Sequence, residues 1–169
     1  VVGGEKAKKR IEAIGSRQAD GKKEFSLTDE QREVLHQIAR DAIAAGLAGS
    51  KYEPPADESL QSKRGAFVTL ELDGQLRGCI GQLRGREPLT DTIAQMAQAA
   101  AFDDPRFTPL TIQEFERLQI EISVLSPLKR VHDINEVQVG RDGLMIKMEF
   151  HSGLLLPQVA TEHGWDRIT

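Results

Sequence analysis

A β-hairpin is predicted over residues 66–83, which read Ala66-Phe67-Val68-Thr69-Leu70-Glu71-Leu72-Asp73-Gly74-Gln75-Leu76-Arg77-Gly78-Cys79-Ile80-Gly81-Gln82-Leu83. The first seven residues are rich in branched and aromatic side chains, which favour strands. Asp73-Gly74 is a preferred two-residue hairpin turn, and the segment after it returns beside the first strand. An antiparallel pair of strands is therefore the first element that the sequence predicts.

The returning strand carries the segment Leu76-Arg77-Gly78-Cys79-Ile80-Gly81. With a two-residue turn, Val68 lies opposite Cys79 and Leu70 lies opposite Arg77. Arg77 and Cys79 are two residues apart, so a regular strand places them on one face of the sheet. A cation beside a thiol favours the thiolate, which is the nucleophilic and metal-binding state of cysteine.

The two glycines of this segment need a local reason, because glycine inside a strand costs roughly 0.5–1 kcal/mol relative to alanine. Gly78 and Gly81 either let a backbone, a ligand or a partner approach closely, or they permit a bulge. Cys79 is likewise open to two interpretations: a functional thiol, or a small hydrophobe packed in the sheet. No histidine lies near it in the sequence to serve as a base.

Helices and further strands surround the hairpin. The spacing of apolar residues and capping boxes predicts helices from Thr28 to Gly46, from Thr90 to Ala101 and from Thr111 to Leu118. Alternating apolar residues predict strands over 120–124, 137–139, 144–148 and 154–156. Since helices and strands do not alternate regularly, the predicted fold class is α+β, with a mostly antiparallel β-sheet and flanking helices. Asp103, Asp104 and Arg106 are interpreted as a helix-ending turn with a local ion pair.

Composition excludes several classes of protein. The 169 residues carry a net charge of −4, and the eight aromatic residues offer few platforms for bases, so nucleic-acid binding is disfavoured. No run approaches the ~18 consecutive apolar residues of a membrane helix. The single cysteine excludes an internal disulfide and fits a reducing cytoplasm. His151 and His163 have no recognised metal spacing, so no metal site is predicted, and the sequence identifies no cofactor.

Residues 1–25 differ from the rest of the chain. Residues 1–24 hold seven Lys and Arg against four Asp and Glu, with few apolar side chains apart from Ile11, Ala13 and Ile14. These three predict at most a short helix. We expect a linker or tail over residues 1–25, with a basic docking arm as the alternative, followed by one domain over residues 26–169.

Four phrases of the sequence together resemble the AMMECR-one domain family: Lys63-Arg64-Gly65-Ala66-Phe67-Val68-Thr69-Leu70, Leu76-Arg77-Gly78-Cys79-Ile80-Gly81, Ala99-Ala100-Ala101-Phe102-x-Asp104-Pro105-Arg106-Phe107, and Gly153-Leu154-Leu155-Leu156-Pro157-Gln158-Val159-Ala160. The resemblance covers about residues 27–166, and the second phrase is the family's hallmark. It implies an α+β fold with a larger and a smaller subdomain, and a groove between them near the hallmark. Relatives continue past Gly164-Trp165-Asp166 into a further C-terminal helix, so this chain is expected to lack it, and residues 1–25 are expected to derive from a linker to a fused upstream domain.

The same resemblance implies partners rather than a reaction. Prokaryotic members are associated with a Memo-type protein, similar to metal-dependent dioxygenases, and with a radical S-adenosylmethionine (SAM) protein. Two hypotheses follow. The chain is either a binding or accessory module for these partners, or an enzyme component with Cys79 as thiolate and Arg77 holding a small anionic ligand in the groove. Gly78, Gly81, Arg106 and Gln158 would complete the binding groove.

Overall fold

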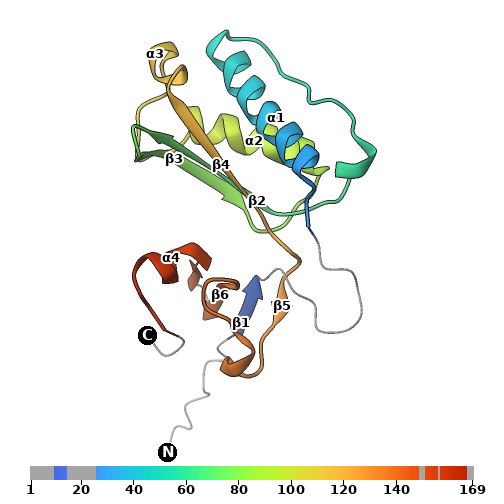
Figure 1. Ribbon diagram of the computed structural model, residues 1–169, viewed down its shortest axis with the longest axis vertical. Coiled ribbons are helices and arrows are strands. Elements are labelled where there is room, and N and C mark those ends of the chain that lie inside the picture. Colours follow the sequence, from blue (N-terminus) through green and yellow to red (C-terminus); the bar gives the residue numbers. More distant parts are fainter. Residues whose placement is uncertain (1–9, 15–25, 149–150, 156, 167–169) are drawn as a thin grey trace, which may run out of the picture. The chain divides into compact units, whose positions relative to one another are not determined.

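The computed structural model describes residues 10–14, 26–148, 151–155 and 157–166 (Figure 1). The chain divides into two compact units: residues 26–125 form the larger one, and residues 1–25 with 126–169 form the smaller one. The predicted hairpin and its hallmark segment lie entirely within the larger unit.

The larger unit is a three-stranded antiparallel sheet with helices on one face (Figure 1). Strands β2 (Ala66–Leu72), β3 (Gln75–Gln82) and β4 (Leu118–Val124) lie in the order β3-β2-β4. Helices α1 (Asp29–Leu47) and α2 (Leu89–Phe102) pack against each other and against this sheet. A short helix α3 (Ile112–Phe115) precedes β4, and one 3-10 turn (Glu58–Leu60) lies between α1 and β2.

Strand alternation decides which side chains form the core. Ala66, Val68 and Leu70 of β2 are fully buried, and their partners on β4 are Val124, Ile122 and Ile120. All of these side chains point toward the helices, because successive residues of a strand point to opposite faces. The helices contribute the other half of the core, with Leu35, Ile38, Ala39, Ala42 and Ile43 from α1 and Ile93, Ala94, Ala97, Ala100 and Ala101 from α2.

Local signals set the ends of these helices. Thr28 and Gln31 form the predicted capping box of α1, and Thr111 and Glu114 form that of α3. The predicted end of α1 at Gly46 is wrong. The helix continues to Leu47 because Gly49, with φ of 65°, takes the left-handed conformation that ends the helix. Gly46 instead lies under the ring of Phe102.

The smaller unit is a four-stranded antiparallel sheet in the order β5-β1-β6-β7. Its strands are β1 (Arg10–Ile14), β5 (Lys129–Arg130), β6 (Gly143–Met148) and β7 (His151–Leu155). A 3-10 turn (Ile134–Glu136) and helix α4 (Pro157–Glu162) complete it. Helices with antiparallel sheets confirm the predicted α+β fold class.

Two elements of the smaller unit differ from the sequence prediction. Residues 10–14 form a strand rather than a short helix, because β5 and β6, which lie more than a hundred residues later, pair with them on both sides. Residues 137–139 do not form a strand. They follow the 3-10 turn, and two backbone hydrogen bonds to the Gln138 carbonyl make a tight turn there instead.

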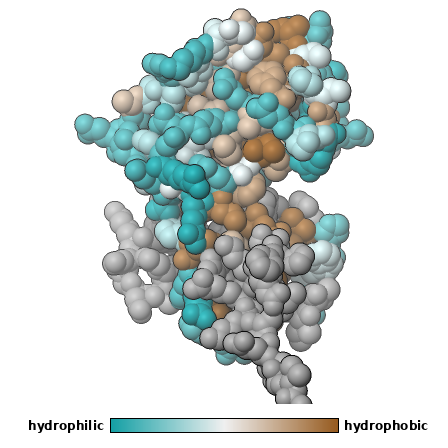
Figure 2. All heavy atoms as spheres, turned by 180° about the vertical axis from the view of Figure 1, so that it is seen from behind, coloured by the Kyte–Doolittle hydropathy of each residue, from teal (hydrophilic) through white to brown (hydrophobic). Residues whose placement is uncertain are grey.

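Hydrophilic residues cover much of the face of the larger unit that Figure 2 presents, with hydrophobic groups between them. Within the described part of the chain, no helix combines the length and the apolar character that crossing a membrane requires.

Candidate functional site

Strand β3 contains a bulge at the hallmark segment. The turn is the predicted one: Asp73 and Gly74 both have positive φ, and Leu72 pairs with Gln75. The register then shifts, so that Leu70 faces Gly78 and Thr69 faces Cys79. Arg77 is the extra residue of the bulge. The predicted pairs Val68–Cys79 and Leu70–Arg77 are therefore wrong by one residue.

The bulge changes which face each side chain occupies. Thr69 alternates with the buried residues of β2, so it points away from the helices, and Cys79 points the same way. Arg77 does not follow the alternation, because it has no residue opposite it. Arg77 and Cys79 are therefore not successive same-face residues of a regular strand, as the sequence predicts, because the bulge interrupts the strand between them.

Both hallmark glycines are explained by contacts within the chain. A Cβ atom at Gly78 would overlap the backbone carbonyl oxygen of Ala100, so this glycine lets helix α2 approach β3. A Cβ at Gly81 would overlap the ring of Phe67, which lies on the neighbouring strand. Both glycines therefore allow close approach of other groups of the same chain, and Gly78 also lies beside the bulge.

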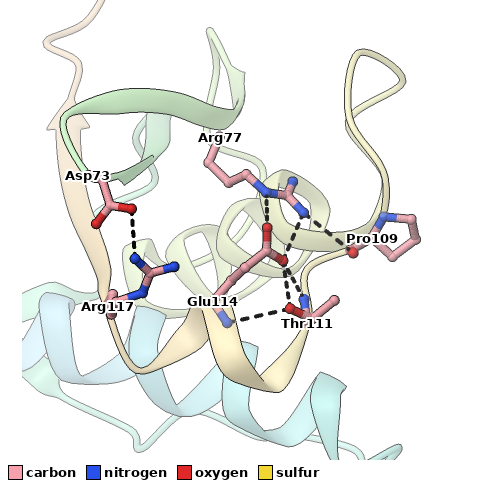
Figure 3. A network of polar contacts seen from close by, with 6 residues as sticks. All are labelled: Asp73, Arg77, Pro109, Thr111, Glu114 and Arg117. Atoms are coloured by element: carbon pink, nitrogen blue, oxygen red, sulfur yellow. Dashed lines mark hydrogen bonds and ion pairs between the residues drawn. The ribbon is translucent and has the colours of Figure 1, made fainter.

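The guanidinium of Arg77 is bound by a carboxylate from α3 (Figure 3). Its Nε and Nη2 atoms donate to Glu114 at 2.9 and 3.1 Å, and Nη2 also lies 3.5 Å from the Pro109 carbonyl oxygen. The Arg77 side chain is only 11% exposed and that of Glu114 is 24% exposed. This bidentate pair joins the bulge to α3, because Glu114 lies 37 residues after Arg77 in the chain.

Glu114 is held in its charged form. The two hydrogen bonds from Arg77 lower the pKa of Glu114 to about 2, against an ordinary 4.5, and donation from the Thr111 backbone and hydroxyl groups adds to this effect. Burial acts in the opposite direction but is weaker. Figure 3 also shows the exposed pair of Arg117 and Asp73, 2.7 Å apart, which joins the start of β4 to the hairpin turn.

A second carboxylate and guanidinium cover the outer edge of β3 at Cys79. Asp104 Oδ2 accepts a hydrogen bond from the Cys79 backbone N–H at 2.9 Å, and Arg106 Nη2 donates to the Cys79 carbonyl at 3.2 Å. Arg106 and Asp104 are paired at 2.7 Å, and the Asp104 side chain is 2% exposed. Hydrogen bonds from Arg106 lower the pKa of Asp104 well below its usual range. This pair takes the place of a neighbouring strand at an edge that would otherwise be open.

The Asp104–Arg106 pair confirms the local ion pair that the sequence predicts. It also adds a role that the sequence did not show, since it fixes the backbone of the hallmark cysteine. The position of Cys79 is therefore set by groups more than twenty residues away.

The thiol of Cys79 is half-buried, and its hydrogen-bonding neighbour is a hydroxyl. Sγ lies 3.2 Å from Thr69 Oγ1, a distance at which either group can donate. The hydrogen bonds of the Arg77 guanidinium go to Glu114 and Pro109 instead. The arrangement can hold a thiol in one rotamer, and a Thr69 hydroxyl can stabilise a thiolate by donating to it.

The remaining predicted site residue, Gln158, belongs to helix α4, but its side chain lies outside the described part of the structure. Among the described residues, no group of three or more His, Cys, Asp or Glu side chains could hold a metal ion. The structure thus brings together Arg106 and the backbone of Cys79, and it gives Arg77 a separate partner.

Sequence reasoning missed two residues of this site, Glu114 and Thr69. Glu114 lies within the helix predicted from Thr111 to Leu118, and nothing local indicates that its carboxylate reaches Arg77. Thr69 was missed because the bulge moves the register by one residue. The glycine beside Arg77 is the one signal of the bulge that the sequence contains.

Comparison with known proteins identifies the chain's relatives. A model of the family described as AMMECR1 matches residues 36–169. Protein MK0488 of Methanopyrus kandleri is 42% identical over 153 residues, which cover 84% of this chain and 74% of that protein. Protein PH0010 of Pyrococcus horikoshii is 41% identical over 155 residues, which cover 84% of this chain and 75% of that protein.

The crystal structure of uncharacterized protein PH0010 from Pyrococcus horikoshii matches the fold. Its TM-score is 0.79 at 40% sequence identity, and the match covers 85% of this chain and 77% of that chain. The names of these relatives state no activity, so the comparisons add a family and a fold but no reaction.

Proposed function

Because the chain belongs to the AMMECR1 family, the AMMECR-one domain proteins, we propose that it is a binding module for other proteins. The proposed partners are a Memo-type metal-dependent protein and a radical SAM protein. The hallmark segment then serves to shape the module, and no reaction is assigned to it.

One observation carries this proposal: the groups of the hallmark segment are bound within the chain. Arg77 is held by Glu114, the Cys79 backbone is held by Asp104 and Arg106, and the space beside both glycines is filled. A site that reacts with a ligand needs groups that are aimed at an open position. A segment whose cation, backbone and glycines all have partners is instead typical of a structural element.

The proposal is tested by measuring binding of the full chain to the two proteins. The Memo-type and radical SAM proteins of the same genome are immobilised in turn, and wild-type and Cys79→Ala chains are passed over them. We expect binding at micromolar or lower concentration, and a change of less than about twofold on removal of the thiol, because truncation of residues outside an interface is nearly neutral.

Two results would contradict the proposal. The first is failure of the wild-type chain to bind either protein at micromolar concentration. The second is a stably folded Cys79→Ala chain that has lost binding, which would place the thiol in the interface.

An enzyme that uses Cys79 is the second candidate. It is favoured by the half-burial of the thiol and by the Thr69 hydroxyl 3.2 Å from Sγ, which can stabilise a thiolate. In this alternative, Cys79 acts on a small anionic ligand and Arg77 would have to exchange Glu114 for that ligand. Alkylation by iodoacetamide distinguishes the two: rapid reaction at pH 6 that slows in Thr69→Val supports the enzyme, and slow reaction in both supports the binding module.

A further inference from the structure

Three exposed cations lie on two segments at one end of the sheet of the larger unit, where β2 begins and β3 ends. They are Lys63, Arg84 and Arg86, here called the basic corner. The unit as a whole is acidic, since residues 26–125 hold ten Lys and Arg against sixteen Asp and Glu. The basic corner is therefore a positively charged patch on a unit whose net charge is negative.

The two segments that carry the basic corner are in direct backbone contact. A Cβ atom at Gly85 would overlap the backbone of Arg64, and a Cβ at Gly65 would overlap the Leu83 carbonyl oxygen. The chain leaves β4 at the same end, where the Leu125 N–H donates to the Gly65 carbonyl at 2.8 Å. The three cations are thus anchored on a tightly packed support rather than on a long free loop.

The basic corner differs from the other exposed cations of this unit in its partners. Arg32, Lys51 and Arg117 are each paired with a carboxylate, although their side chains are 61%, 84% and 59% exposed. Within the part of the chain that the structure describes, Lys63, Arg84 and Arg86 form no ion pair. The nearest acid in sequence, Glu87, accepts a hydrogen bond from Gln95.

We propose that the basic corner is the surface on which an acidic segment of a partner protein docks. This inference rests on the proposed function and specifies the partner's chemistry. Arginine binds carboxylates in a bidentate manner, so two arginines and a lysine favour Asp- and Glu-rich surfaces. Elsewhere the acidic unit repels such a surface, and this repulsion orients the partner during encounter.

The observations favour an acidic protein over a nucleic acid. The segments 62–65 and 83–87 contain no aromatic residue on which a base could stack. A nucleic acid is also a long polyanion, and beyond the basic corner it would lie along an acidic body. A compact acidic segment avoids this repulsion.

The experiment compares two triple variants of the full chain with equal charge. Lys63→Gln/Arg84→Gln/Arg86→Gln removes the basic corner, and Arg32→Gln/Lys51→Gln/Arg117→Gln removes three exposed cations elsewhere on the same unit. The probes are a fluorescein-labelled twelve-residue Asp/Glu peptide, a labelled twelve-base-pair DNA duplex, and the two partner proteins. Binding is followed by fluorescence anisotropy and association kinetics between low and physiological salt.

We expect the peptide to bind the wild-type chain at low salt more tightly than the duplex does. Loss of the basic corner should weaken peptide binding about tenfold or more and slow association with the partner, whereas the control variant should change both by less than about threefold. Equal effects of the two triple variants, tighter binding of the duplex, or no peptide binding by the wild-type chain would each overturn the inference. If the partner proteins bind the corner variant as tightly as the wild-type chain, the inference is overturned and the proposed function stands. If they bind neither the wild-type chain nor either variant, the proposed function is overturned.

Discussion

The pair of Arg77 and Glu114 makes a quantitative prediction about stability and pH. In Glu114→Gln the carboxylate is lost while the side-chain shape is kept, and the guanidinium of Arg77, 11% exposed, loses its counter-charge. The pKa of Glu114 is held at about 2 in the folded chain, against an ordinary 4.5. Each tenfold difference in proton affinity is worth about 1.4 kcal/mol, so the charged carboxylate contributes up to about 3.5 kcal/mol at pH 7.

The sign of the pH dependence follows from the lowered pKa. The contribution is fully present above pH 4.5, where Glu114 is ionised in both the folded and the unfolded chain. It is lost as the pH falls toward 2, because the unfolded chain then takes up the proton first. At pH 3 we expect the difference between wild type and Glu114→Gln to fall to about 1.4 kcal/mol, less than half of its value at pH 7.

Urea unfolding followed by far-ultraviolet circular dichroism measures this difference, because α1 and α2 dominate the helical signal and both belong to the larger unit. Glu121→Gln is the matched control, since Glu121 is exposed on β4 and forms no ion pair among the described residues. Equal stability of Glu114→Gln and wild type at pH 7, or a deficit of the same size at pH 7 and pH 3, would refute the reasoning.

Two further variants test the packing of the hallmark segment. Asp104→Asn should destabilise the chain by about 1–3 kcal/mol and speed hydrogen exchange of the Cys79 amide, because the buried carboxylate loses its charge-assisted hydrogen bonds to Arg106 and to that amide. The exposed neighbour is the control, and Asp103→Asn should have little effect on either measurement. Gly78→Ala should lower the melting temperature severely, because the added Cβ would overlap a backbone carbonyl of α2. Gly153→Ala is the control and should leave the melting temperature almost unchanged, because no atom lies near its added Cβ. Normal exchange at Cys79 in Asp104→Asn, or equal melting of the two alanine variants, would contradict these assignments.

The elements that depend on local signals could be predicted from the sequence. The turn at Asp73-Gly74 follows from the preference of those two residues for positive φ, and the capping box of Thr28 with Gln31 needs contacts only three residues apart. The helical faces also follow from a local repeat, because residues three and four apart lie on one side of a helix.

The contacts that join distant segments could not be predicted. Nothing near Arg77 in the chain indicates that its partner is Glu114, and nothing near Gly81 indicates that the ring of Phe67 fills the space beside it. The bulge links these failures, because one extra residue moves every later cross-strand pair. Because the sequence does not predict that Arg77 is a bulge residue, it assigns Val68 rather than Thr69 as the cross-strand partner of Cys79.

The Arg77–Glu114 pair and the basic corner lie at opposite ends of one hairpin, and their effects should therefore be separable. Arg77 lies beside the turn end of β2, near Leu70 and Glu71, while Arg64 and its neighbours precede the first residue of that strand. At about 3.3 Å per residue the two places are roughly 20 Å apart, beyond the range at which substitutions usually couple. A chain that combines Glu114→Gln with Arg84→Gln should lose the stability of the first variant and the binding of the second, each by the amount seen alone. Coupling of more than about 0.5 kcal/mol in either measurement would show that the shape of the hairpin and the docking of an acidic partner are not independent.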